Sequence, residues 1–209
     1  MDNPDIGQSP EFALAVLAGG RSQRMQGQDK GLALLAGKPL FMHVLARMGQ
    51  AAAQTVVVTG QHAEAYGQAG FPVIADAGIG PLGGILAAMQ AVARQWPFHW
   101  LLVVPCDMPF LPEDLRTRLW QAVQASGSEL AVPVCEGNRQ HAVMLCHLRL
   151  AAELEAYLVS GGRSIHGWLD QLAPAYVDFG DCAPFANLNT PEELMAADGV
   201  IKHPDGKHE

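Results

Sequence analysis

An almost wholly apolar segment, residues 12–17, leads without interruption into a loop that carries glycines and basic side chains. Segments of this kind are typical of strands buried on both faces of a parallel sheet, so the loop is expected to leave the carboxyl edge of that sheet. Ligands of open α/β sheets collect at this edge. Gly19 and Gly20 let backbone N–H groups approach an anion closely. Countercharge comes from three basic residues, Arg21, Arg24 and Lys30. The segment predicts a nucleotide triphosphate site; the alternative is a glycine-rich surface turn with solvated basic side chains.

Short apolar segments then alternate with amphipathic ones. The expected strands are 55–58, 71–75 and 100–104, and the expected helices are 39–50, 62–68, 82–96 and 112–125. This alternation predicts parallel strands joined by right-handed crossovers. The chain has 209 residues, 49% of them hydrophobic, which is enough for one sizeable core and short for two. We therefore expect a single three-layer, Rossmann-like α/β domain.

The pattern changes in the second half. Strands are expected at 129–134 and 141–147, and the short connection between them is typical of a hairpin-like, mixed region in an otherwise mostly parallel sheet. Helices at 148–160 and 164–172 and a strand at 176–179 are expected to follow. Thr190-Pro191-Glu192-Glu193 opens a final helix as a capping box. The polar tail from Gly199 onward is expected to be frayed.

The charge balance limits the partners. With 13 basic and 21 acidic side chains the net charge is −8, which argues against a general nucleic-acid or membrane surface. No apolar run is long enough to span a bilayer, and Met1 to Asp5 has none of the features of a secretion signal. The expected location is the cytoplasm.

The cysteines and histidines are scattered. Cys106, Cys135, Cys146 and Cys182 are spaced too irregularly for a zinc knuckle or a redox Cys-x-x-Cys, so we expect reduced thiols without a metal or disulfide role. Among the histidines, only His141 is kept as a candidate for the site.

A second motif, Val103 to Pro109, places Asp107 at the carboxyl end of a buried strand, between two prolines that restrict the backbone. Magnesium prefers one or two carboxylates together with phosphate oxygens, so a single aspartate beside a triphosphate is sufficient. Asp107 is therefore the predicted metal ligand. The alternative is that it only caps the turn that follows.

The first loop fits neither a Walker loop nor Gly-x-Gly-x-x-Gly. Its pattern, Leu17-Ala18-Gly19-Gly20 followed by Arg24-Met25 and Asp29-Lys30-Gly31, resembles that of the nucleotidyltransferases, and within them the molybdenum cofactor guanylyltransferases. Gln26 stands where the family usually has glycine, which affects the local geometry of the loop. The resemblance runs from about Phe12 to Ala197.

The resemblance implies which residues hold GTP. They are Leu17, Ala18, Gly19, Gly20 and Lys30, with Asp76 after the third strand and Asp107 as the Mg²⁺ ligand. The family's asparagine after the second strand is missing, and Thr59 is the nearest substitute. The alternative for Asp76 is a turn residue that binds its own backbone.

Three further segments match the family. Gly78 to Gly84 is similar to a segment whose helix start lies near the nucleotide, although a tight packing turn would have the same glycines. Asn187 and Asn189 stand in an element that relatives use for the pterin acceptor, and Arg163 matches an arginine placed for the acceptor's phosphate. Without the resemblance, the two asparagines would be loop and cap residues.

The resemblance implies transfer of GMP from GTP to the terminal phosphate of molybdopterin, with release of pyrophosphate. Arg24, Lys30 and Asp107 would be the catalytic residues and Mg²⁺ the cofactor. The domain would span 12–198, with a GTP-binding half (12–110) and an acceptor-binding half (111–198), flanked by flexible residues 1–11 and 199–209. Small-molecule substrates, proteins of molybdopterin synthesis and molybdoenzyme maturation, and a monomeric state are implied.

Two alternatives remain. A cytidylyltransferase would use the same acceptor, but those relatives have Leu-Ala-Ala-Gly where this chain has Leu17-Ala18-Gly19-Gly20. A protein that binds GTP or molybdopterin without turnover has less need of Lys30 and Asp107 together.

Overall fold

The computed structural model describes residues 10–18, 29–76 and 78–202. Its centre is an eight-stranded sheet. In spatial order the strands are β10 (Ala175–Asp178), β7 (Leu130–Cys135), β9 (Met144–His147), β6 (Trp100–Pro105), β1 (Phe12–Leu17), β4 (Gln54–Thr59) and β5 (Val73–Ala75), and β8 (Asn138–Arg139) pairs with β7. β9 runs antiparallel to both of its neighbours, and β8 runs antiparallel to β7. The other pairs are parallel, so those strands end at one common edge.

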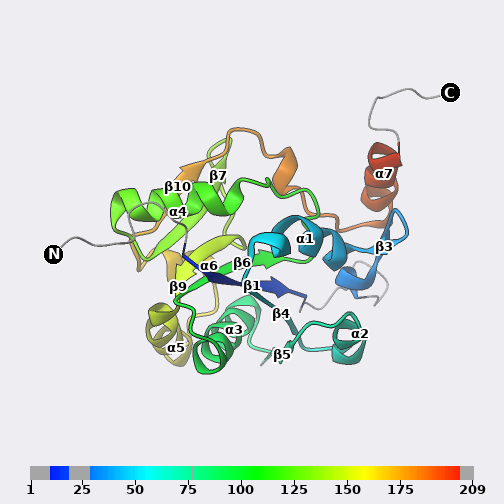
Figure 1. Ribbon diagram of the computed structural model, residues 1–209. Coiled ribbons are helices and arrows are strands. Elements are labelled where there is room, and N and C mark those ends of the chain that lie inside the picture. The colour runs from blue at the N-terminus through cyan, green and yellow to red at the C-terminus, as the bar shows by residue number, and fades with distance from the viewer. Residues whose placement is uncertain (1–9, 19–28, 77, 203–209) are drawn as a thin grey trace.

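Helices cover both faces of the sheet, which gives the predicted three layers (Figure 1). One face packs on α1 (Leu40–Met48) and α4 (Leu115–Ser126). The other packs on α3 (Pro81–Gln95), α5 (Ala151–Val159) and α6 (Ile165–Leu169). α2 (Ala63–Gln68) lies next to β5.

The residues of β1 show why this strand is central. Its larger side chains, Phe12, Leu14 and Val16, enter the core with α1 and α4, whereas Ala13 and Ala15 enter the core with α3. Since successive strand residues point to opposite faces, both faces of β1 are apolar and buried.

A third, smaller core joins residues 33–40, which follow the first loop, to residues 188–197 near the end of the described chain. The antiparallel hairpin of β2 (Leu34–Leu35) and β3 (Lys38–Pro39) packs against α7 (Pro191–Lys202). Leu35, Leu40 and Leu188 are buried there together. The second half of the chain therefore returns to the residues that follow the first loop. Short 3-10 turns complete the fold at η2 (Lys30–Leu32), η3 (Gly49–Ala51), η4 (Leu148–Leu150) and η5 (Ala183–Phe185).

The predicted α/β class, the mostly parallel sheet and its mixed second half are confirmed. Several element boundaries differ by two or three residues; β9 begins at Met144 rather than 141, and α6 ends at Leu169 rather than 172. α4 begins at Leu115 rather than 112, because the amide of Leu115 closes a turn on the carbonyl of Pro112. α7 continues to Lys202, past the predicted domain end at 198. None of the described helices is long and apolar enough to cross a bilayer.

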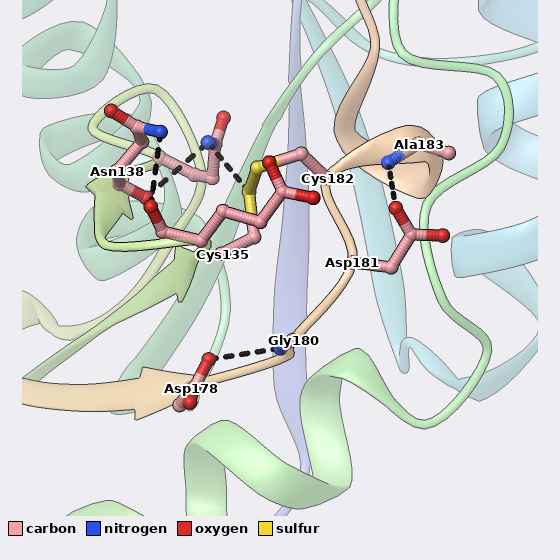
Figure 2. Close-up of a disulfide and its surroundings, with 9 residues drawn as sticks. Cys135, Asn138, Asp178, Gly180, Asp181, Cys182 and Ala183 are labelled. Carbon is pink, nitrogen blue, oxygen red and sulfur yellow. Dashed lines mark hydrogen bonds between the residues drawn. A yellow bond between two sulfur atoms is a disulfide. The ribbon is translucent and has the colours of Figure 1, made fainter.

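The expectation for the cysteines is wrong for two of them. Cys135 and Cys182 form a disulfide, with their Cα atoms 5.1 Å apart (Figure 2). Cys135 ends β7 and Cys182 follows β10, and these strands are parallel neighbours. The Phe179 amide donates to the Val134 carbonyl at 2.7 Å, which continues the pairing toward the disulfide. Spacing along the sequence carries no information about this contact. Cys106 and Cys146 are buried free thiols, as expected.

Candidate active site

The carboxyl ends of β1, β4, β5 and β6 lie side by side, and they carry most of the predicted nucleotide residues. Leu17 ends β1, and its carbonyl accepts from the Cys106 amide at 3.0 Å. Ala18 donates its amide to the Val58 carbonyl at 2.8 Å. At Ala18 the chain therefore leaves β1 between the end of β4 and the strand end that carries Asp107.

Lys30 reaches this edge from the first turn of η2. Its Nζ lies 3.5 Å from Asp107 Oδ2 and donates a hydrogen bond to Asn189 Oδ1. The side chains of Lys30 and Asp107 are 23% and 15% exposed, so the pair is partly shielded from water but still accessible. We call Lys30, Asp107 and Asn189 the Lys30 cluster.

The backbone near Asn189 is fixed to the same place. The Leu188 amide donates to the Asp107 carbonyl at 2.9 Å, and the Leu188 side chain is buried. Glu193 Oε2 accepts from the Thr190 amide at 3.0 Å, and the Glu193 amide donates to Thr190 Oγ1 at 3.2 Å, so the predicted capping box is confirmed. The structure thus joins a residue predicted for the acceptor to two residues predicted for GTP.

Burial sets the electrostatics of Asp107. Desolvation raises the pKa of its carboxyl group, and the ammonium of Lys30 opposes that shift. Because the Asp107 carboxylate is partly desolvated and has Lys30 as its cationic neighbour, binding of a further cation would stabilise its charge. In the described part of the chain no three His, Cys, Asp or Glu side chains form a metal-binding group. A site with one protein carboxylate and substrate phosphate oxygens fits Mg²⁺, so Asp107 fits the role of its ligand.

Thr59 and Asp76 lie at the neighbouring strand ends. Thr59 is buried, and its Oγ1 donates to the Gln61 carbonyl at 2.6 Å. The Asp76 amide donates to the Thr59 carbonyl at 3.0 Å, and Asp76 Oδ1 accepts from the Gly78 amide at 3.0 Å. The turn role of Asp76 is therefore present in the structure. It is compatible with a nucleotide contact, because a carboxylate accepts several hydrogen bonds.

The glycines at the start of α3 have a packing role. A Cβ on Gly84 would lie 3.2 Å from Val58 Cγ1, and one on Gly83 would lie 3.1 Å from Ile79 Cβ. Glycine at these positions lets the start of α3 approach β4 and the preceding turn closely. The packing alternative considered from the sequence is thus supported.

Arg163 is placed apart from the Lys30 cluster. It lies between α5 and α6, and its Nη1 donates to the carbonyls of Leu158 and Gly162 at 2.8 and 2.6 Å. α5 and α6 pack on the sheet face with α3, whereas Phe185, shortly before Asn187, is buried in the core of the opposite face. Asn187 is exposed. Among the described residues, no bond links Arg163 to either asparagine.

His141 does not lie with the Lys30 cluster either. Its Nε2 is 3.1 Å from Nδ1 of His166 in α6. Desolvation, and then the proximity of His166, lower the pKa of His141. The residues of the first loop that the sequence singled out lie outside the described residues; they are Gly19, Gly20, Arg21, Arg24, Met25 and Gln26.

A buried polar side chain near Lys30 was not predicted from the sequence. Tyr66 in α2 is fully buried, and its hydroxyl donates to Asp29 Oδ1 at 2.6 Å. The same Asp29 oxygen accepts from the Gly31 amide at 2.9 Å. A tyrosine among small and polar residues of a short helix was the available sign, but nothing in the sequence connects it with the first loop.

Known proteins are similar to this chain over most of its length. A family model described as the MobA-like NTP transferase domain matches residues 14–175, a range that contains Lys30, Asp76 and Asp107. The molybdenum cofactor guanylyltransferase of Cupriavidus taiwanensis is 42% identical over 189 residues, which cover 87% of this chain and 93% of that protein. The protein of that name from Serratia proteamaculans is 37% identical over 190 residues, covering 88% and 93%.

A solved structure agrees with the sequence matches. Molybdopterin-guanine dinucleotide biosynthesis protein A from Archaeoglobus fulgidus superposes with a TM-score of 0.74 at 26% identity. The superposition covers 91% of this chain and 98% of that one. The likeness therefore extends over nearly the entire length of both proteins.

Proposed function

Because the chain belongs to the MobA-like NTP transferase family, together with the molybdenum cofactor guanylyltransferases, we propose that it transfers GMP from GTP to molybdopterin. The observation that carries the proposal is the Lys30 cluster, in which a cation and a carboxylate meet at the carboxyl edge of the sheet. That edge is where open α/β sheets bind nucleotides.

The reaction needs alignment more than proton transfer. An oxygen of the acceptor's terminal phosphate forms a bond to the α-phosphorus of GTP, and the bond from that phosphorus to the oxygen bridging to the β-phosphate breaks. The attacking phosphate is already ionised at neutral pH, so no general base is required. Lys30, and in the proposal also Arg24, offset the negative charge that the two substrates bring together.

Asp107 is the residue proposed to hold the metal. When bound, Mg²⁺ would supply charge neutralisation at the phosphates, as is usual in phosphoryl-type transfer. The Asp107 carboxylate also orients Lys30, since the two groups lie 3.5 Å apart. The proposed contacts to the rest of GTP are Leu17, Ala18, Gly19, Gly20, Thr59 and Asp76.

Asn187 and Asn189 are the proposed contacts for the acceptor, together with Arg163. The hydrogen bond from Lys30 to Asn189 supports an acceptor site that adjoins the phosphates of GTP, as the transfer requires. We also propose that the protein acts as a monomer in the cytoplasm, where its nucleotide substrate is found.

Nucleotide choice is the first test. We expect GTP to bind at least about tenfold more tightly than CTP, because the loop has the Gly19-Gly20 form of the guanylyl branch. Calorimetry with both nucleotides measures this difference. Equal affinities or a preference for CTP would favour the cytidylyltransferase, and GTP binding without pyrophosphate release in the presence of acceptor and Mg²⁺ would favour the non-catalytic alternative.

A pair of alanine variants separates the two substrates. Arg163→Ala is expected to raise the KM for the acceptor and leave that for GTP unchanged, because Arg163 bonds to the carbonyls of Leu158 and Gly162 and, within the described part of the chain, not to the proposed GTP residues. Asn189→Ala is expected to raise both KM values, because Asn189 accepts a hydrogen bond from Lys30. Steady-state kinetics with each substrate varied in turn gives the four values. A loss of GTP affinity in Arg163→Ala, with circular dichroism intact, would contradict the assignment.

A further inference from the structure

The Tyr66 hydroxyl is buried beneath the segment that carries Lys30. Tyr66 comes from α2, and its ring packs edge-on against Phe41 with a centroid distance of 4.8 Å. Its hydroxyl donates to Asp29 Oδ1 at 2.6 Å. Desolvation, and then the hydrogen bond to Asp29, raise the pKa of Tyr66, so the hydroxyl remains a donor at physiological pH.

The Asp29 carboxylate holds the backbone on both sides of Lys30. Asp29 precedes Lys30, and the Oδ1 that binds Tyr66 also accepts from the amide of Gly31, which follows Lys30. The buried Tyr66 hydroxyl thus fixes the Asp29 carboxylate, and this carboxylate in turn fixes the backbone on either side of Lys30. Without the Tyr66 hydroxyl, the Asp29 carboxylate would still accept a hydrogen bond from the Gly31 amide, but it would lose its hydrogen bond to α2.

Gly31 shows how closely the tyrosine approaches. A Cβ on Gly31 would overlap the Tyr66 hydroxyl and would lie 3.2 Å from Cys106 Sγ. Cys106 directly precedes Asp107. The tyrosine, the Lys30 segment and the strand end that carries Asp107 therefore pack against one another at a single point.

We propose that Tyr66 is a positioning residue for nucleotide binding: through Asp29 and Gly31 it holds Lys30 where its ammonium meets Asp107, Asn189 and the phosphates of GTP. This inference rests on the proposed function for the identity of the phosphates. The positioning itself is a property of the unliganded protein and can be measured without turnover.

The test is Tyr66→Phe, which removes the hydroxyl and keeps the ring in its core. We expect the KM for GTP to rise about tenfold, since a hydrogen bond to a charged group is lost, while the KM for the acceptor is unchanged. Tyr176→Phe is the matched control, because Tyr176 is 40% exposed on the edge strand β10. A merely structural role would lower the active fraction, and so kcat, without changing the KM for GTP.

A second measurement does not depend on catalysis. Hydrogen exchange at the Gly31 amide, followed by NMR without nucleotide, is expected to be faster in Tyr66→Phe than in the wild type and unchanged in Tyr176→Phe. Unchanged Gly31 exchange in Tyr66→Phe would overturn the inference. Faster exchange in a protein that transfers no GMP would contradict the proposed function and leave the positioning role intact.

A double-mutant cycle checks the contact with Gly31. Gly31→Ala is expected to weaken GTP binding strongly in the wild type, because the added methyl group overlaps the tyrosine hydroxyl. In the Tyr66→Phe background the same change should cost less, because that oxygen is absent. Additive effects in the two backgrounds would show that Tyr66 does not determine the conformation of the Lys30 segment.

Discussion

Replacement of Asp107 with asparagine is expected to lower the rate of pyrophosphate release by about a hundredfold or more, the scale of losing a preorganised charge in an active site. Asparagine has nearly the shape of aspartate, and the Asp107 backbone bond to Leu188 does not involve the side chain. The fold should therefore be retained. The variant loses the anionic oxygen that lies 3.5 Å from Lys30 and that is proposed to hold Mg²⁺. Initial rates at a series of Mg²⁺ concentrations measure both effects.

The control for this variant is Asp114→Asn. Asp114 lies at the start of α4, its side chain is 60% exposed, and its ion pair is with Arg118, away from the Lys30 cluster. This control should have wild-type activity and a wild-type response to Mg²⁺. If Asp107→Asn has an unchanged rate and the same Mg²⁺ dependence, Asp107 only caps the turn that follows β6, the alternative that its sequence context leaves open.

Most of the residues at the carboxyl edge of the sheet were predictable, because each of them follows the end of a strand. Residues that come directly after buried parallel strands must meet at one edge, so Ala18, Asp76 and Asp107 could be placed together from the sequence. The same reasoning placed Arg163 and Asn189 only in the second half of the chain. It could not show that α7 returns to the β2–β3 hairpin and brings Asn189 to Lys30 while Arg163 stays on the other helical layer.

Tyr66 and the disulfide were missed for a related reason. Hydrophobic periodicity reports which face of an element is buried, but it does not report which polar atom meets another across the core. The Tyr66 bond to Asp29 spans two elements with no pattern in common. Cys135 and Cys182 meet because β10 adds to the sheet beside β7, a strand order that neither segment specifies alone.

Loss of the disulfide is expected to have the second large effect. Cys135 and Cys182 are 47 residues apart, and the chain-entropy model gives about 4 kcal/mol for closing a loop of that size. We therefore expect Cys182→Ser to unfold at a clearly lower urea concentration than the oxidised wild type. The variant is made at Cys182 because Cys135 is fully buried, where a serine hydroxyl would add its own desolvation cost.

Reduction separates the disulfide from the substitution itself. With excess dithiol reductant, the wild type and Cys182→Ser should unfold at nearly the same urea concentration, because both then lack the covalent link. Equal midpoints under oxidising conditions would contradict a stabilising role. The KM for GTP should change little, because the segment after Cys182 is also held by the buried Phe185 and by the Leu188 bond to Asp107. The disulfide would then stabilise the fold around the Lys30 cluster without setting the position of Asn189.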